Sequence, residues 1–91
     1  ASSLLAADVA AGKKAYDQYC KRCHGADGAP NAAIAKMMKV EMHHLGDKVV
    51  QDKSDKELWK ESIEGIGKMK AIPAAAKDGD NIVAFLRTLK K

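Results

Sequence analysis

A chain of 91 residues has room for one small domain, which we expect to span residues 1–91. Its residues are 46% hydrophobic, but sixteen are alanine and only 4% are aromatic, so a disulfide, a metal, a cofactor or a partner is expected to complete the core. The composition excludes a disordered chain, and no apolar run approaches the ~20 residues that cross a bilayer. The net charge of +4 indicates an acidic partner, whereas no basic run with interleaved aromatic residues points to nucleic acid.

The first predicted element is a helix that follows a loose N-terminal tail, residues 1–7. Asp8 is a suitable N-cap, and apolar residues recur at helical spacing as far as about Arg22. Gly12 lies on the apolar face, where glycine costs ~1 kcal/mol relative to alanine. We therefore expect another backbone to pass close to Gly12. A turn rich in Gly, Asp and Pro, Gly25–Pro30, ends the helix.

The middle of the chain is predicted to hold two further helices. The segment Asn31–Val40 has the composition of a short helix, and residues 41–53 are expected to form a loop. Ser54 and Glu57 have the spacing of a capping box, which opens a third helix. Gly65 ends it, because glycine readily adopts the left-handed terminal conformation.

The last predicted helix runs from about Gly79 to Leu89 and carries an apolar stripe. Asp78 is expected to cap it, and an irregular loop, residues 67–76, precedes it. No segment alternates with a period of two, so the sequence predicts an all-α fold of about four helices.

The motif Cys20-Lys21-Arg22-Cys23-His24 carries the most chemical information in the chain. The pattern C-x-x-C-H is the attachment signature of c-type haem. Two thiols three positions apart lie on one side of a helix, where they can form thioethers with both vinyl groups of one porphyrin. The following His24 can then direct a nitrogen at the iron. The sequence thus predicts one haem c, covalently attached through Cys20 and Cys23.

Other readings of the two cysteines stay open at this stage. A zinc site needs two more ligands, and the adjacent pair His43-His44 matches the usual zinc spacing poorly. A thioredoxin-like pair would follow a strand, and none is predicted before Cys20. A disulfide between the two cysteines would close too short a loop to stabilise much. A chance match to the motif is the remaining alternative.

The chain offers several candidates for a second axial ligand of the iron. Met69 lies in a glycine-containing loop between two predicted helices, and we favour it. The alternatives are His43 or His44, another methionine, or water. The other methionines, which occur in the middle segment, are expected to have a packing role, and one of the adjacent pair Met37 and Met38 is expected to touch the haem edge, because methionine fills irregular gaps well. They are Met37, Met38 and Met42.

These features resemble class I c-type cytochromes, in particular the short bacterial members with one haem. The resemblance runs from about Asp8 to the C-terminus and includes Gly12-x-x-x-Tyr16, the C-x-x-C-H motif and Gly65-x-Gly67-Lys68-Met69. It implies the small cytochrome c fold, with the first and last helices crossing at near right angles. In that arrangement Gly12 and Tyr16 would face Phe85 and Leu86.

The resemblance also implies roles for individual residues. His24 and Met69 would be the axial ligands, and the Pro30 carbonyl would accept a hydrogen bond from the other ring nitrogen of His24. Trp59 is expected either beside the haem or in the core. Lys70 follows Met69 where short members of the family commonly have proline, which is delayed here to Pro73.

The function implied is one-electron transfer between redox partners, without enzymatic activity. His/Met ligation leaves no open position for oxygen or peroxide, and methionine ligation favours a moderately positive potential. Two alternatives are a haem domain of a larger redox enzyme or membrane complex, and a haem sensor or enzyme with a labile sixth ligand. We expect an exported, periplasmic or otherwise extracytoplasmic monomer that has lost a signal peptide and has no membrane insertion. An acidic redox partner is expected to dock on basic residues around the haem edge: Lys21, Arg22, Lys68 and Lys70, joined by Lys36 and Lys39.

Overall fold

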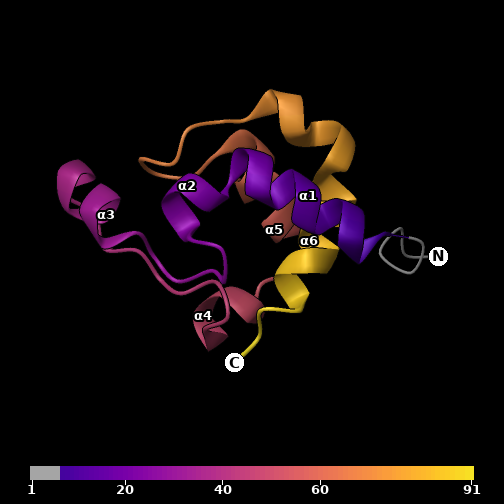
Figure 1. The fold of residues 1–91 in the computed structure, drawn as a ribbon, viewed down its shortest axis with the longest axis horizontal. Coiled ribbons are helices and arrows are strands. Elements are labelled where there is room, and N and C mark those ends of the chain that lie inside the picture. The colour runs from indigo at the N-terminus through magenta and orange to yellow at the C-terminus, as the bar shows by residue number, and fades with distance from the viewer. Residues whose placement is uncertain (1–6) are drawn as a thin grey trace.

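The helices follow one another along the chain with short connections between them (Figure 1). The structure is a computed structural model, and it describes residues 7–91. Within that range the elements are α1 (Val9–Tyr19), α2 (Lys21–His24), α3 (Ala32–Met38), α4 (Lys48–Gln51), α5 (Asp55–Glu64), the 3-10 helix η2 (Pro73–Asp78) and α6 (Gly79–Arg87). The only strand-like pairing in the described range is an isolated bridge, so the all-α prediction is confirmed. Residues 1–6 of the predicted N-terminal tail lie outside the described residues.

Two of the three predicted N-caps are formed. The Asp8 carboxylate accepts hydrogen bonds from two backbone amides in the first turn of α1. Ser54 and Glu57 form the reciprocal capping box at the start of α5. Asp78 makes no side-chain cap bond, because η2 runs directly into α6 and supplies backbone partners there. Local sequence signals thus set where α1 and α5 begin.

The helix expected from Asp8 to about Arg22 is divided into two. α1 ends at Tyr19, and α2 resumes at Lys21 after a break at Cys20. The Cys20 carbonyl oxygen then accepts hydrogen bonds from the amides of Cys23 and His24, at 3.2 and 3.1 Å. With α2 and the four-residue α4, the described range holds six α-helices where the sequence suggested about four.

α1 and α6 cross in close contact (Figure 1). A Cβ atom on Gly12 would lie 1.9 Å from the Asn81 carbonyl oxygen and 3.1 Å from Cβ of Phe85. Only glycine allows the two backbones to approach so closely, which confirms the expectation for Gly12. The Asn81 side chain adds to this contact, since its amide oxygen accepts a hydrogen bond from the Asp8 amide at 2.9 Å.

The core lies between α1, α5 and α6. Its centre is the pair Tyr16 and Phe85, whose ring centroids are 4.9 Å apart and whose planes are tilted by 54°. The expected contact between α1 and this part of α6 is therefore present. Trp59 packs over Gly79, where a Cβ atom would lie 2.0 Å from the indole nitrogen. The buried residues of this cluster are Ala15, Tyr16, Cys20, Ile63, Ala75, Ile82, Phe85 and Leu86.

A polar network fixes α4 and the start of α5 against α6. The Arg87 guanidinium donates to the Asp55 carboxylate at 2.7 Å, to the Gln51 carbonyl oxygen at 2.8 Å and to the Lys53 carbonyl oxygen at 2.8 Å. The Gln51 amide in turn donates to the Leu86 carbonyl oxygen at 3.0 Å. This network explains why α4 forms inside the segment that was expected to be a loop. None of the helices described is long and apolar enough to cross a membrane.

Candidate functional site

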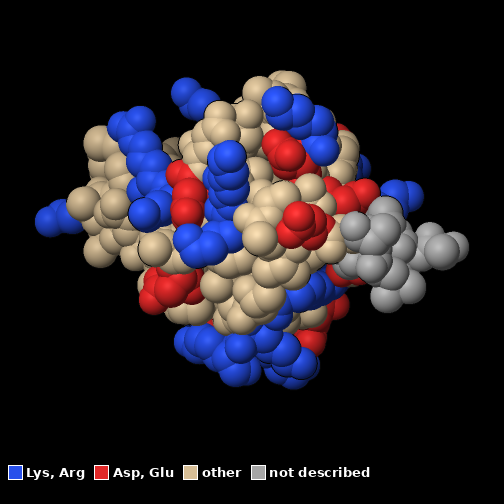
Figure 2. Space-filling view, turned by 45° about the vertical axis from the view of Figure 1, so that its right-hand side comes forward, with Lys and Arg blue, Asp and Glu red and all other residues tan. Residues whose placement is uncertain are grey.

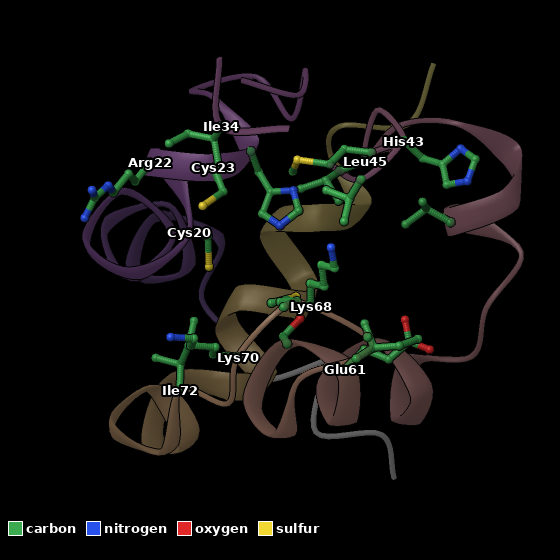
Figure 3. A pocket seen from close by; sticks show the side chains of 18 of the residues that line it. Cys20, Arg22, Cys23, Ile34, His43, Leu45, Glu61, Lys68, Lys70 and Ile72 are labelled. Carbon is green, nitrogen blue, oxygen red and sulfur yellow. The ribbon is translucent and has the colours of Figure 1, made fainter. Parts of the chain in front are cut away.

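One large pocket brings the predicted site residues together. It has a volume of about 830 Å³, and all six described α-helices contribute to its walls. Cys20, Cys23, His24 and Met69 all line it. Figure 3 shows the two cysteines on one side of this pocket, with His43 and Glu61 on the other. Pro30, expected to contact His24, does not line the pocket.

Hydrogen bonds hold the segment Cys20–His24, which carries the C-x-x-C-H motif, where it follows the break between α1 and α2. The buried Tyr16 hydroxyl donates its hydrogen bond to the Gly25 carbonyl oxygen at 2.6 Å, and the His24 carbonyl oxygen lies 3.2 Å from the same hydroxyl. The Asn31 amide nitrogen donates to the Cys23 carbonyl oxygen at 2.9 Å. These bonds fix the C-terminal end of α2, which carries His24.

Burial sets the protonation of the cysteine and histidine side chains. Loss of solvent, with a smaller effect of Cys23, raises the pKa of the Cys20 thiol to about 11. Burial also lowers the pKa of His24, which favours the neutral imidazole that binds metals. Both thiols are free, so the disulfide alternative is not supported.

Nδ1 of His24 is buried and has no hydrogen-bond partner among the described residues. The bond expected between His24 and the Pro30 carbonyl is therefore not formed in this structure. An unpaired buried nitrogen costs ~1–3 kcal/mol, so its presence marks His24 as a residue with a further role.

Met69 lines the pocket from a short hairpin. Ile66 and Met69 exchange both backbone hydrogen bonds, at 3.1 and 2.9 Å, around the two-residue turn Gly67-Lys68. Gly67 has a φ of +58°, the positive value required at the first position of this kind of turn. The delay of proline to Pro73 does not disturb the hairpin, since Pro73 opens η2.

The structure distinguishes between the two histidines that were the other candidates for the second axial ligand. His44 does not line the pocket, and its Nδ1 accepts a hydrogen bond from the Gly46 amide at 2.8 Å. His43 does line the pocket. Met37, Met38 and Met42 also line the pocket, as expected for methionines that pack against a cofactor.

Sequence reasoning gave no role to two polar contacts in the pocket wall. Lys53 and Glu61 form an ion pair at 2.6 Å, and each side chain is only 25–30% exposed. The Lys68 ammonium donates to the Met38 carbonyl oxygen at 2.8 Å. Both contacts join residues distant in sequence, so no local pattern could have revealed them. Trp59, by contrast, lies outside the pocket and has the core role that was one of its two expected positions.

The residues present fit a haem group. The volume lies within the ~300–1,000 Å³ typical of cofactor sites, and the lining is mostly apolar. Thiols, a neutral imidazole and a thioether are the donors that attach and ligate haem iron. The zinc alternative does not fit, because residues 7–91 contain no group of three or more His, Cys, Asp or Glu placed to hold a metal ion.

Comparison with known proteins agrees with this assignment. The family model for cytochrome c matches residues 9–90, nearly the whole chain. Cytochrome c-554(547) of Halothiobacillus neapolitanus is 33% identical over 91 aligned residues, which cover 93% of this chain and 100% of that protein. Both comparisons cover most of the chain, and the chain belongs to the cytochrome c family.

Proposed function

We propose that the protein is a one-electron carrier that holds one haem through thioethers to Cys20 and Cys23, with His24 and Met69 as axial ligands. The observation that carries this proposal is the placement of all four side chains around one apolar pocket. When bound, the haem supplies an iron centre that cycles between Fe(II) and Fe(III). Membership of the cytochrome c family supports a haem-based electron carrier.

The protein's own residues favour a carrier over an enzyme. Ligation by both His24 and Met69 would leave no coordination position for a substrate. Methionine ligation and apolar surroundings both favour the ferrous state, which supports a moderately positive potential. In the ligated state we propose that Nδ1 of His24 gains the Pro30 carbonyl as its acceptor, since a donor left buried and unpaired is costly.

The docking surface that we propose consists of the basic residues around the pocket mouth, defined as Lys21, Arg22, Lys36, Lys39, Lys68 and Lys70. All six are exposed. Figure 2 shows basic side chains on several parts of one face of the molecule, with acidic side chains interspersed. An acidic redox partner would be steered to this surface, and its association would slow as salt rises.

Location and assembly follow from the same proposal. Attachment of haem to a C-x-x-C-H motif takes place after export, so we infer an extracytoplasmic, monomeric protein whose signal peptide has been removed. Fractionation of the native host and light scattering of the purified protein test these two points.

The ligand assignment is tested by substitution at Met69. The ferric wild type should show the weak far-red band of a methionine–iron bond. Met69→Ala should lose this band and bind added imidazole rapidly, whereas Met37→Ala is a matched control because Met37 lines the same pocket and is 69% exposed. Loss of the band in Met37→Ala, or its survival in Met69→Ala, would refute the assignment.

A further inference from the structure

The pocket mouth is spanned by a hydrogen bond between segments far apart in sequence. The Lys68 ammonium donates to the carbonyl oxygen of Met38, 30 positions earlier, at 2.8 Å. Both residues line the pocket. Figure 3 shows the Lys68 side chain extending between the two walls of the pocket. This bond therefore links the hairpin that carries Met69 to the end of α3.

The hairpin needs such a link because its tip makes few contacts. A Cβ atom on Gly67 would meet nothing within 4 Å, so the turn stands clear of the rest of the protein. The base is held well: the Ile72 amide donates to the Ile63 carbonyl oxygen at 2.7 Å, and a Cβ atom on Gly65 would lie 2.4 Å from the Met69 carbonyl oxygen. Beyond that base, the Lys68–Met38 bond is the side-chain hydrogen bond that the turn makes within the described residues.

The acceptor is well suited to an ammonium group. Met38 is the last residue of α3, and carbonyls in the last turn of a helix lack partners inside the helix. The helix ends in the left-handed residue Lys39, at a φ of +55°, whose amide donates to the carbonyl oxygens of Ala35 and Lys36 and leaves that of Met38 free. A positive charge is favourable at this negative end.

We infer that Lys68 is a positioning residue for Met69. By tying the hairpin to α3, Lys68 keeps Met69 inside the pocket and limits how often an outside ligand can take its place. The inference rests on the proposed ligation by Met69. The other lysines of the docking surface are assigned to it by their exposure and charge alone, whereas Lys68 also makes a hydrogen bond across the pocket.

The experiment measures imidazole binding to the ferric holoprotein by stopped flow. Binding requires that Met69 leaves the iron, so the rate reports how often the hairpin opens. Lys68→Met should bind imidazole roughly three- to ten-fold faster, the range allowed by the net strength of one hydrogen bond. Lys68→Arg retains the donor and should restore the wild-type rate within about two-fold.

Lys70→Met is the matched control. Lys70 adjoins Met69 on its other side, lines the same pocket and is also exposed, but its side chain makes no hydrogen bond or ion pair in the described range. Its rate should stay within about two-fold of the wild type, well short of the effect of one lost hydrogen bond. An equal acceleration in Lys68→Met and Lys70→Met would show that the loss of positive charge alone is responsible. No acceleration in either variant would show that the Lys68–Met38 hydrogen bond does not limit the opening of the hairpin. Either result would overturn the inference.

A second measurement separates this inference from the ligand assignment. Amide hydrogen exchange at Met69 reports the bond from its N–H to the Ile66 carbonyl oxygen, 2.9 Å, whatever ligates the iron. Faster exchange in Lys68→Met but not in Lys70→Met, with equal midpoints of global unfolding, supports a local tie. Unchanged exchange in Lys68→Met overturns it. Absence of the far-red band in the wild type would instead overturn the proposed ligation.

Discussion

Replacement of Gly12 by alanine tests the close contact of α1 and α6. A new Cβ atom would lie 1.9 Å from the Asn81 carbonyl oxygen, and real Cβ atoms essentially never approach within 3.0 Å. The two helices must therefore separate by at least 1.1 Å at this point. The obstacle is backbone, so no side-chain rotation can relieve it.

Two effects of opposite sign decide the magnitude. Alanine is favoured over glycine inside a helix by ~1 kcal/mol. Overpacking costs about 1–3 kcal/mol or more, and a gap of about 1 Å forfeits a quarter to a half of the dispersion energy across it. Separation of the helices would open such a gap between Tyr16 and Phe85, which pack at 4.9 Å. For an obstacle made of backbone we take the upper part of the overpacking range, so we expect a net loss of about 1–2 kcal/mol from a total stability of ~5–15 kcal/mol.

The assay is denaturant unfolding of the holoprotein, followed by circular dichroism. Lys14→Ala is the control, because Lys14 lies in the same helix and is exposed, so its replacement should change the free energy of unfolding by less than about 0.5 kcal/mol. Equal or greater stability of Gly12→Ala would mean that helix propensity outweighs packing. The close approach of α1 and α6 would then be wrong.

Three further predictions concern the polar network, the C-terminus and the pocket. Arg87→Met should lower the free energy of unfolding by about 1.5–3 kcal/mol, since charged hydrogen bonds to three partners are lost; an unchanged urea midpoint would contradict this. A hydrogen bond from Lys91 at 2.9 Å holds the pKa of Asp47 below its ordinary value, so Lys91→Met should raise that pKa in an NMR titration. Because the pKa of Asp47 is lowered in the folded state, the stability from this pair is present above the ordinary pKa and is lost as pH falls through the folded-state pKa. The free energies of unfolding of wild type and Lys91→Met should therefore differ at neutral pH and converge in strong acid. Haem-free Cys20→Ala/Cys23→Ala should unfold at a lower urea concentration than the holoprotein, since the mostly apolar lining of a pocket of about 830 Å³ is then left in contact with water; an equal urea midpoint would contradict this.

Much of the fold could be predicted because the signals are local. Asp8 and the Ser54–Glu57 box set helix starts through bonds within one turn, and the sequence shows both. Gly12 could be interpreted for a different reason. A glycine inside a helix lowers the stability of that helix, and close packing against another backbone explains why it is found on the apolar face. The C-x-x-C-H motif predicted that Cys20, Cys23 and His24 share one pocket, because its spacing puts both thiols on one side of a helix with the histidine next to them.

The rest depends on contacts that no periodicity encodes. The break at Cys20 is not marked by a glycine or a proline, so no local pattern in the sequence indicates it. α4 forms because Arg87, far along the chain, supplies donors to its end. The Lys68–Met38 bond is of the same kind. Exposed polar side chains that pair across long sequence separations look like ordinary surface residues in the sequence.

The most direct test of the central claim is the absorption spectrum of the purified protein, ferric and then reduced, read into the far red. We predict a c-type haem spectrum with the weak far-red band of methionine bound to ferric iron, as expected if His24 and Met69, which line the same pocket, are the axial ligands. A haem spectrum without that band would contradict ligation by Met69 and return the position to His43 or water. Absence of haem, in protein made by a host that attaches it, would contradict the role of Cys20 and Cys23.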